Sequence, residues 1–440
     1  MVFLLTDILL FILFFLVIVA VFFVLKNPLL KEKWLKVINF PIAASALIIF
    51  LFYLTIGILD SIHFKDNNNK YSIGIYSLLD KVIEPALVNE EKTYSTPFSY
   101  QQFSKEFLAD GSRWYPHLKN AAIGITNDVD NILNIVKIFL LSLLYSLIPV
   151  IFFVFFQKIK KANILKSLNL NSKKAIFWTL YVLVFLIIFT LMLIQNYHIF
   201  GTDKTGMDVF YKAVKSIRTG LVIGTLTTFL MLPIAITLGI LAGYFKGFVD
   251  DIIQYIYTTI NSIPSILLIA ALVLLLQIYM DEHAKDFASS IERSDVRLLL
   301  LCIILGMTSW TGLCRIIRSE TLKLSELEFI QAAKVFGVSN FKIMFRHLLP
   351  NLMHLVLITI VLDFSGLVLA EAILSYIGIG VDPDSMSWGN MINSARFELS
   401  REPIVWWPLL AAFIFMFGLV LSVNLFADKV RKVFDTKEVF

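Results

Sequence analysis

Long apolar runs separated by short polar segments are the main pattern along the chain. Nine such runs recur, and each is long enough to cross a hydrocarbon core of roughly 30 Å, which takes about 20 helical residues. Runs of this length exclude the short alternating strands of a membrane barrel. The sequence therefore predicts an all-α fold, a polytopic transmembrane helical bundle of about nine spans. The predicted spans lie near residues 3–25, 37–59, 138–156, 175–195, 219–243, 257–279, 297–316, 351–375 and 404–427.

The composition supports a membrane protein. Hydrophobic residues make up 58% of the chain and charged residues 16%, and the mean hydropathy is +0.80. A soluble domain of this length cannot bury so much apolar surface. The net charge is +5, but the basic residues fall in short loops instead of one stripe, so we expect the lipid bilayer and no nucleic acid as a partner.

Lysines between the runs predict the orientation of the bundle. Two short loops are rich in lysine, and the residues concerned are Lys26, Lys31, Lys33 and Lys36 in the first and Lys158, Lys160, Lys161, Lys166, Lys173 and Lys174 in the third. By the positive-inside rule both loops are cytoplasmic, which places the N-terminus outside and the C-terminus inside. The first run lacks a basic segment and a small-residue cleavage site, so we expect a retained helix and no signal peptide.

The chain is predicted to have two parts. Residues 1–156 form an N-terminal extension with three spans and a polar external segment near 60–131. Residues 157–440 form a six-span core with a cytoplasmic loop near 317–350. Aromatic residues at 93–98 and 113–116 of the external segment either contact a partner or pack a small cap, and we favour the cap slightly.

The sequence contains no recognisable motif for nucleotide binding, metal binding or catalysis. No Gly-x-x-x-x-Gly-Lys-Ser/Thr phosphate loop occurs, and no His, Cys, Asp or Glu cluster has metal spacing. Cys302 and Cys314 are twelve residues apart on one predicted helix, about 18 Å, too far to pair. We therefore expect no catalytic residue, no metal and no cofactor bound by this chain.

The polar stretch from Ser319 to Asn351 is the most informative part of the sequence. It is rich in helix-forming residues and far longer than two spans need to be joined. Gly337 suits a helix C-terminus in the left-handed region, Ser339 or Asn340 can begin a second short helix, and Pro350 marks the start of the next span. Two short helices and a sharp turn form either a lever for a soluble partner or an ordinary interfacial helix pair, and the shape alone leaves both open.

Two sets of polar residues are candidates for a translocation pathway or gate. Asp363 and Glu371 lie within the eighth span, where a carboxylate must face a cavity or a partner; the alternative is burial against a hydrogen-bonding neighbour. The other set is in the external loop before the fifth span, where the capping of that helix is the favoured alternative, and comprises Gly201, Asp203, Gly206 and Asp208.

Glycine and tryptophan residues near the last two spans have local interpretations. Gly378 and Gly380 permit a tight external turn. Trp388, Trp406 and Trp407 are expected as anchors at the membrane interface.

The run from Phe329 to Asn351 resembles the EAA loop of ABC-importer permeases, and in particular of the dipeptide and oligopeptide permease family. Four further segments also resemble that family in the same order, namely residues 198–209, 370–381, 387–391 and 424–431. The resemblance implies a type I ABC-importer-like permease core in a bacterial cytoplasmic membrane. It also implies coupling to the ATPase through Gln331, Ala332, Ala333, Gly337, Leu349 and Pro350, with Gln331 standing where the family usually has Glu.

The resemblance further implies the partners and the transported solutes. The partners are a homologous permease subunit, two cytoplasmic ATP-binding subunits that carry ATP-Mg, and an extracytoplasmic solute-binding protein. The solutes are dipeptides, oligopeptides or related small molecules. The alternative is a proton-coupled secondary transporter in which Asp363 and Glu371 relay protons, and a membrane enzyme is disfavoured because no catalytic cluster is present.

Overall fold

The computed structural model describes residues 4–65, 75–107, 112–119, 121, 125, 127–159, 168–283, 287 and 289–434. Lys160, Lys161 and Lys166 of the predicted basic loop lie outside these residues. The chain divides into two compact units. Unit 1 contains residues 1–3, 28–220 and 386–426, and unit 2 contains residues 4–27, 221–385 and 427–440. The boundary at residue 156 between the extension and the core is based on the sequence pattern and stays a prediction.

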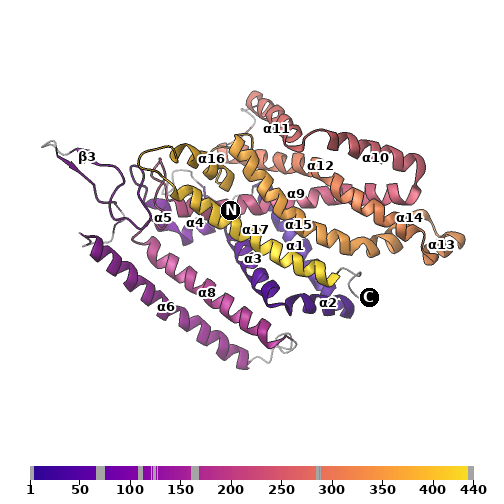
Figure 1. Cartoon of the computed structure of the whole chain (residues 1–440), viewed down its shortest axis with the longest axis horizontal. Helices are drawn as coiled ribbons and strands as arrows, with labels where there is room; N and C mark the ends of the chain where they lie inside the picture. Colours follow the sequence, from indigo (N-terminus) through magenta and orange to yellow (C-terminus); the bar gives the residue numbers. More distant parts are fainter. Residues whose placement is uncertain are drawn as a thin grey trace. The chain divides into compact units, whose positions relative to one another are not determined.

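Helices make up most of the described chain (Figure 1). Unit 1 holds α2 (Pro28–Ile38), α3 (Pro41–Asp60), α4 (Leu78–Val82), α5 (Glu84–Val88), α6 (Asp128–Ile159), α8 (Leu170–Ile194) and α16 (Trp388–Glu398). Unit 2 holds α1 (Leu5–Lys26), α10 (Gly247–Ser262), α11 (Ser265–Glu282), α12 (Ser290–Ser325), α13 (Glu328–Val335), α14 (Asn340–Ile343), the π-helix η2 (Met344–Leu348) and α15 (Leu349–Ile377). Helices α9 (Val209–Phe245) and α17 (Trp407–Phe434) contribute to both units.

Two small antiparallel sheets accompany the helices of unit 1. Strands β1 (His63–Lys65) and β2 (Ile75–Ser77) pair with His63 opposite Ser77. Strands β3 (Glu106–Phe107) and β4 (Arg113–Trp114) pair with Glu106 opposite Trp114. Both hairpins belong to the segment predicted to lie outside the membrane, so the bundle itself is helical as expected.

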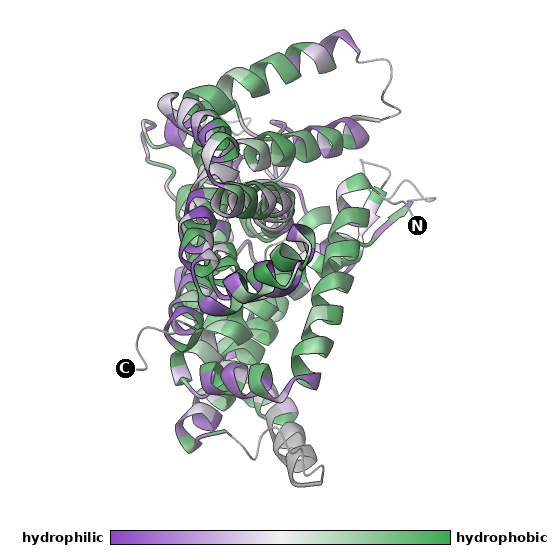
Figure 2. Ribbon diagram, turned by 90° about the vertical axis from the view of Figure 1, so that its right-hand side faces the viewer, coloured by the Kyte–Doolittle hydropathy of each residue, from purple (hydrophilic) through white to green (hydrophobic). Residues whose placement is uncertain are grey.

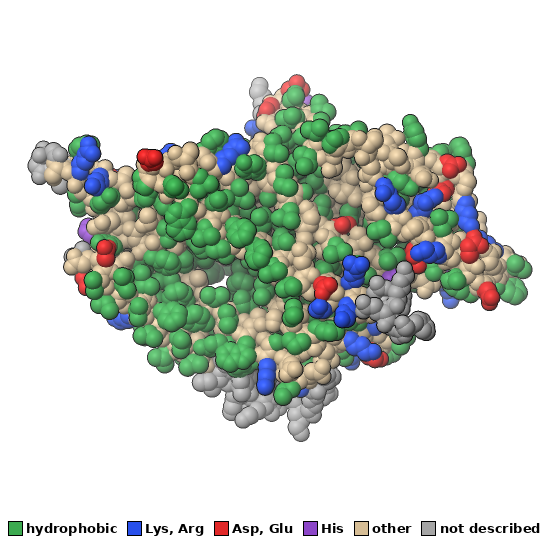
Figure 3. All heavy atoms as spheres, viewed as in Figure 1, with side chains coloured by type: hydrophobic (Ala, Val, Ile, Leu, Met, Phe, Trp, Pro, Cys, Tyr) green, Lys and Arg blue, Asp and Glu red, His purple; other side chains and the backbone are tan. Residues whose placement is uncertain are grey.

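The predicted nine spans are confirmed among the described residues. Nine helices are long and apolar enough to cross a membrane, and their apolar lengths are visible in Figure 2. Hydrophobic side chains cover broad areas of the face in Figure 3, as expected for a surface in contact with lipid. In α9 and in α12, half of the residues in the 18-residue apolar stretch are buried, whereas none are buried in α1. Helices α9 and α12 are therefore interior helices.

The predicted sixth span is wrong at its start. The structure has two helices there, α10 and α11, and Pro264 follows an extended residue, Ile263, with φ −90° and ψ 131°. Proline disfavours helical backbone in the residue before it, which separates the two helices. The membrane-spanning part therefore begins at Ser265 and not near 257, and α10 is an amphipathic helix that precedes the span.

Unit 1 is built around α8, which packs against both α3 and α6. Phe139 of α6 meets the edges of Phe185 and Phe189 of α8 at centroid distances of 5.4 and 5.7 Å. Tyr53 of α3 donates a hydrogen bond to the carbonyl of Phe415 in α17 at 3.0 Å. The spans of the N-terminal extension thus pack directly on helices of the predicted core.

Small residues bring α9 and α12 together in unit 2. A Cβ on Gly239 would lie 2.8 Å from the side chain of Ile317, and one on Gly243 would lie 2.6 Å from Thr321. These glycines are one turn apart on α9, the spacing that allows close approach of membrane helices. The hydrophobic core around this contact includes the buried side chains of Met231, Ile317, Ile343 and Leu348. This core joins the hairpin of α13 and α14 to the spans.

Candidate functional site

The predicted cytoplasmic hairpin has a defined turn. Helix α13 ends before Gly337, which has φ +73°. The amide of Gly337 donates to the carbonyl of Lys334, and the amide of Val338 donates to the carbonyl of Ala333, both at 3.0 Å. These two bonds form a Schellman motif, which satisfies the last carbonyls of a helix and needs a left-handed residue. The predicted role of Gly337 in the helix end is confirmed.

The helices around this turn differ from the prediction in one respect. The polar stretch does not begin a new helix at Ser319, because α12 continues to Ser325. The hairpin proper therefore consists of α13, the Gly337 turn and α14, followed by η2 and α15. In Figure 1 α13 lies beyond the ends of α12 and α15.

Apolar side chains point outward from the hairpin. Val335 and Phe336 are 85% and 84% exposed, and Phe341 is 67% exposed. The rings of Phe341 and Phe345 are 4.4 Å apart. Exposed aromatic and aliphatic groups gathered on a rigid turn are typical of a protein interaction site.

The inner side of the hairpin is fixed to α9 and α12. Ile330 and Ile343 are completely buried. The hydroxyl of Tyr244 donates to Asn340 at 2.8 Å, and the ammonium of Lys334 lies 4.8 Å from the ring centroid of Tyr244. These contacts hold the inner side of the hairpin to the end of α9.

An ion pair joins the turn between α9 and α10 to the end of α12. Lys246 pairs with Glu326, which follows α12. The hydrogen bond and charge of Lys246 lower the pKa of the Glu326 carboxyl below its usual value. The pair is exposed to solvent, so it contributes little to stability.

The other predicted coupling residues occupy distinct places in the hairpin. The side-chain amide of Gln331 donates to the carbonyl of Ser325 at 2.8 Å, whereas Ala332 is exposed on the outer side of α13. Ala333 and Leu349 pack against the core cluster beneath the hairpin. Pro350 stands in the first turn of α15, where proline is tolerated.

The predicted external glycines are contact positions. A Cβ on Gly206 (φ +79°) would lie 1.8 Å from the backbone oxygen of Glu91, and one on Gly201 (φ +63°) would lie 2.1 Å from that of Ser95. The amide of Glu91 also donates to the carbonyl of Gly206 at 3.0 Å. Both glycines therefore allow the external segment of the extension to dock on the loop at 195–208.

The two acids of this loop hold local structure. Asp203 pairs with Lys212 and accepts the amides of Thr205 and Met207 at 2.9 and 3.1 Å. Asp208 accepts the amide of Tyr211 at 3.1 Å at the start of α9, which is the capping role favoured from the sequence.

A buried histidine, which was not predicted as a site residue, links Asp208 to the segment that contains Glu91. His198 is 1% exposed, with Nδ1 2.6 Å from Asp208 and Nε2 3.9 Å from Glu91. Burial lowers the pKa of this imidazole, but the two carboxylates outweigh burial and raise the pKa to about 9. His198 is therefore a cation at neutral pH and offsets one of the two buried negative charges.

A second buried ion cluster was also missed. Lys215 of α9 lies 3.0 Å from Asp60, at the end of α3, and 2.9 Å from Asp80 of α4. Tyr211 donates a hydrogen bond to Asp80 at 3.0 Å. Burial raises the pKa of Asp80, but the charge of Lys215 and the hydrogen bonds from Ser77, Lys215 and Tyr211 hold it below its usual value. This cluster joins α9 to two helices of the extension.

Two of the predicted interface tryptophans are buried instead. Trp388 and Trp407 are each 1% exposed, and their indole N–H groups donate to the carbonyls of Ala213 and Thr202 at 3.0 and 2.9 Å. The interface interpretation is wrong for both, because a tryptophan beside a span serves equally well as a buried donor. Trp406 is 47% exposed.

The two carboxylates of the eighth span are not brought together. Asp363 and Glu371 lie eight residues apart on α15, which is about 12 Å along a helix. Asp363 is partly buried. Glu371 is 1% exposed and accepts a hydrogen bond from the hydroxyl of Ser375 at 2.7 Å.

The end of α15 beside Glu371 is a tight turn. Gly378 has φ +88°, and the amide of Val381 donates to the Ser375 hydroxyl at 3.3 Å. A Cβ on Gly380 would lie 2.0 Å from that hydroxyl. The tight turn expected from the two glycines is confirmed, and it fixes the surroundings of Glu371.

Cation-binding groups are not clustered in the part of the chain that the structure describes. No group of three or more His, Cys, Asp or Glu residues there has the geometry of a metal site. Cys302 and Cys314 are both buried, free thiols.

The chain is a multi-pass helical membrane protein with a rigid, apolar-tipped hairpin outside its spans. Residues 235–436 match the family described as the binding-protein-dependent transport system inner membrane component. The dipeptide transport system permease protein DppC of Lactococcus lactis subsp. cremoris is 32% identical over 243 residues, which cover 55% of this chain and 65% of that protein.

Two further relatives match over a similar region. DppC of Alkalihalophilus pseudofirmus is 31% identical over 54% of this chain and 72% of its own length. The oligopeptide transport system permease protein OppC of Haemophilus influenzae is 29% identical over 56% of this chain and 72% of its own length. The chain therefore belongs to the binding-protein-dependent permease family of the ABC importers, whose members are inner-membrane transport components.

Proposed function

We propose that this chain is the membrane-spanning permease subunit of an ATP-driven importer for dipeptides, oligopeptides or related small solutes. The observation that carries the proposal is the hairpin of α13 and α14, with Val335 and Phe336 exposed at its turn. Exposed apolar groups on a rigid turn fit a groove of a soluble partner. The names of the relatives supply the class of solute.

The proposed assembly contains other chains. ATP-Mg binds and is hydrolysed on two cytoplasmic subunits, a homologous permease chain completes the pathway, and an extracytoplasmic binding protein delivers the solute. Family membership supports this composition. When ATP closes the two ATP-binding subunits, they move the hairpin, and the contacts of Ile330 and Asn340 carry that movement into α9 and α12.

The proposed orientation places the hairpin in the cytoplasm and the N-terminus outside. The support is the positive-inside rule, which assigns the loops that carry Lys26, Lys36, Lys173 and Lys174 to the cytoplasm. The external side then carries the β-hairpins, α16 and the loop at 195–208. We propose that the external segment of the extension, near 60–131, acts as a fixed cap on that loop.

Asp363 and Glu371 are proposed to line or gate the pathway. Their place in a span and the partial burial of Asp363 support this role. For Gly201, Asp203, Gly206 and Asp208 the contacts favour a structural role in holding the cap. The family and the relatives give no support to the proton-coupled alternative.

One pair of variants tests the hairpin directly. Gly337→Asp should abolish solute uptake while the chain still reaches the membrane, because Gly337 has φ +73° and no neighbouring heavy atom within 4 Å of an added Cβ. The matched control is Gly247→Asp, since Gly247 has φ +53° and equally open surroundings outside the hairpin. Uptake that fails in the first variant alone supports the proposal, and equal uptake in both variants contradicts it.

A further inference from the structure

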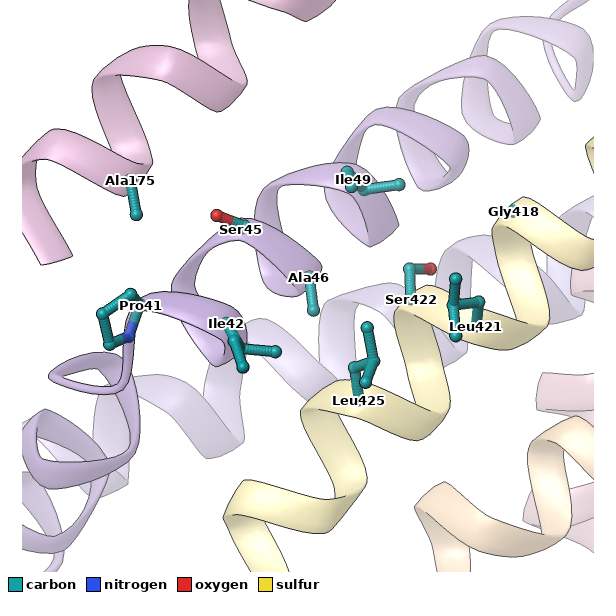
Figure 4. Close-up of a pocket in the computed structure, with 10 residues that line it drawn as sticks. All are labelled: Pro41, Ile42, Ser45, Ala46, Ile49, Ala175, Gly418, Leu421, Ser422 and Leu425. Carbon is teal, nitrogen blue, oxygen red and sulfur yellow. The ribbon is translucent and has the colours of Figure 1, made fainter.

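A groove in unit 1 lies between membrane-spanning helices. It has a volume of about 370 Å³ and lies between α3, α8 and the inner half of α17 (Figure 4). Its lining is almost wholly apolar and consists of Pro41, Ile42, Ser45, Ala46, Ile49, Ala175, Gly418, Leu421, Ser422 and Leu425. The volume is in the range of ligand pockets. A peptide would find few hydrogen-bonding groups here, so the groove suits an apolar occupant.

The two lining hydroxyls are already engaged. Ser422 donates to the carbonyl of Leu419 at 2.7 Å, and the hydroxyl of Thr179 donates to Ser45 at 2.8 Å. The occupant therefore needs no polar groups along the groove. A saturated hydrocarbon chain meets this condition.

The groove is open along one side and closed at one end. Ile42, Leu421 and Leu425 are 53%, 40% and 38% exposed, and in a span such side chains face lipid. At the far end Tyr53 fills the space beside Gly418, where an added Cβ would lie 2.4 Å from the tyrosine hydroxyl. A hydrocarbon chain can enter the groove from the bilayer and extend only as far as Tyr53.

Basic residues gather at the opposite end of the groove. Lys173 and Lys174 directly precede the lining residue Ala175 in the first turn of α8. The start of α8 is held to the α2–α3 junction, because Asn39 accepts the amide of Asn169 at 2.9 Å and the hydroxyl of Ser172 at 2.6 Å. These bonds place the lysines of α2 and α8 at the same end of α3.

Helix α2 is suited to the membrane interface. It carries Lys36 and, on its other side, Trp34, which stacks on Phe426 of α17 at 6.3 Å. Phe426 follows the lining residue Leu425. A short amphipathic helix with lysines and a tryptophan is typical of the headgroup region.

We propose that this groove binds an anionic phospholipid of the cytoplasmic leaflet. One acyl chain lies between α3 and α17 and ends at Tyr53, and the headgroup phosphate lies among Lys36, Lys173 and Lys174. An apolar, bilayer-open groove with cations at its headgroup end matches both parts of such a lipid. The site depends on the membrane placement of these helices and not on the transport activity.

Native mass spectrometry of the full-length chain tests the site. The delipidated chain is offered phosphatidylglycerol, phosphatidylcholine or a free fatty acid, and retained molecules are counted. We expect one tightly held phosphatidylglycerol per chain. Ala175→Phe fills the groove from α8 and should reduce retention at least tenfold, whereas Leu186→Phe, at a 46% exposed position of the same helix, should leave it unchanged.

Charge variants test the binding of the lipid headgroup separately from the binding of the acyl chain. The double variant Lys173→Gln/Lys174→Gln should reduce the preference for phosphatidylglycerol over phosphatidylcholine about twentyfold, because each basic residue near an anionic surface contributes roughly a fivefold increase. The control Lys105→Gln/Lys204→Gln removes the same charge from exposed positions of the external segments and should leave the preference unchanged.

Three results would overturn the proposal. Equal retention of the two phospholipids by the wild-type chain removes the headgroup site, and tighter retention of the fatty acid assigns the groove to a free acid. Loss of the retained lipid on assembly with the other permease chain shows that a protein helix fills the groove. Uptake measurements on the same variants report on transport separately, so each proposal fails by its own measurement.

Discussion

The hairpin of α13 and α14 and the predicted external cap, formed by the segment near 60–131 and the loop at 195–208, use similar residues in opposite ways. Each has a positive-φ glycine at its centre, Gly337 in one and Gly206 in the other. Around Gly337 the space is open, whereas a Cβ on Gly206 would lie 1.8 Å from a neighbouring backbone oxygen. At the hairpin apolar side chains remain exposed, and in the cap charged side chains are buried and paired.

Under the proposed function, the hairpin is a surface for a partner chain, whereas the partners of the cap residues belong to the same chain. The hairpin contributes its backbone shape and leaves its apolar groups available. The cap satisfies its groups internally through His198, Lys215 and two indole donors. Substitutions in the cap should therefore act on stability, and substitutions at the tip of the hairpin should act on assembly.

The largest effect on stability is expected at Lys215. Lys215→Met leaves the carboxylates of Asp60 and Asp80 buried without their cation, which should lower the free energy of unfolding by about 3–5 kcal/mol. The measurement is the thermal unfolding midpoint and the amount of chain in the membrane. Lys212→Met is the control, because its pair with Asp203 is more exposed, and an equal loss in both variants would contradict the special role of Lys215.

Alanine at the two glycines compares the regions directly. Gly206→Ala combines backbone strain with a collision against Glu91, and we expect a loss of about 3 kcal/mol in unfolding free energy. Gly337→Ala adds strain alone and should cost about 1–2 kcal/mol. Chemical denaturation of both variants in detergent gives the two values. A larger loss at Gly337 would reverse the comparison.

The cap should lose stability as pH rises. The pKa of His198 is raised from its ordinary value of 6.5 to about 9 in the folded protein. A group whose pKa is raised on folding stabilises fully below its unfolded value, so the contribution is complete below pH 6.5 and is lost as pH rises through 9. We expect a decline of about 3 kcal/mol over this range. Denaturation at several pH values should show a flatter profile for His198→Gln than for the wild type.

The smallest effect is expected at Gln331. In Gln331→Glu the carboxylate cannot donate to the carbonyl of Ser325 and places a negative charge near the C-terminal end of α12. Both changes are unfavourable, by about 1 kcal/mol together. Gln331→Ala removes the bond without adding charge and should fall between the wild type and the Glu variant in thermal unfolding. A stabilised Glu variant would contradict this assignment.

Much of the fold can be predicted from local sequence signals. The nine spans follow from the length of the apolar segments alone, because a long apolar segment in lipid must form a helix to satisfy its backbone hydrogen bonds. Gly337 is predicted at a helix end and Gly378 in a tight turn, since the left-handed conformation is a property of one residue. The boundary near 257 failed because the apolar pattern of α10 continues into α11, and the break is made by Pro264 alone.

The contacts of the cap could not be predicted because their partners are far apart in sequence. Glu91 meets Gly206, and Asp80 meets Lys215, with more than a hundred residues between the members of each pair. Each of these residues taken alone resembles an ordinary loop or helix-end residue. The burial of Trp388 and Trp407 could not be predicted for the same reason, because the carbonyls that accept their indole N–H groups lie far away in the sequence.

The central claim is that the hairpin is held by a nucleotide-driven subunit, and crosslinking tests it most directly. A single cysteine replaces Val335, which is 85% exposed, in a chain whose buried Cys302 and Cys314 are changed to alanine. A photoactivatable group on this cysteine should capture a cytoplasmic chain that contains a Gly-x-x-x-x-Gly-Lys-Ser/Thr segment. The same group at Tyr255→Cys, 72% exposed on α10, is the control. Capture at position 335 and not at 255 is the predicted result, and labelling of position 335 from the outer side of the membrane would contradict the account.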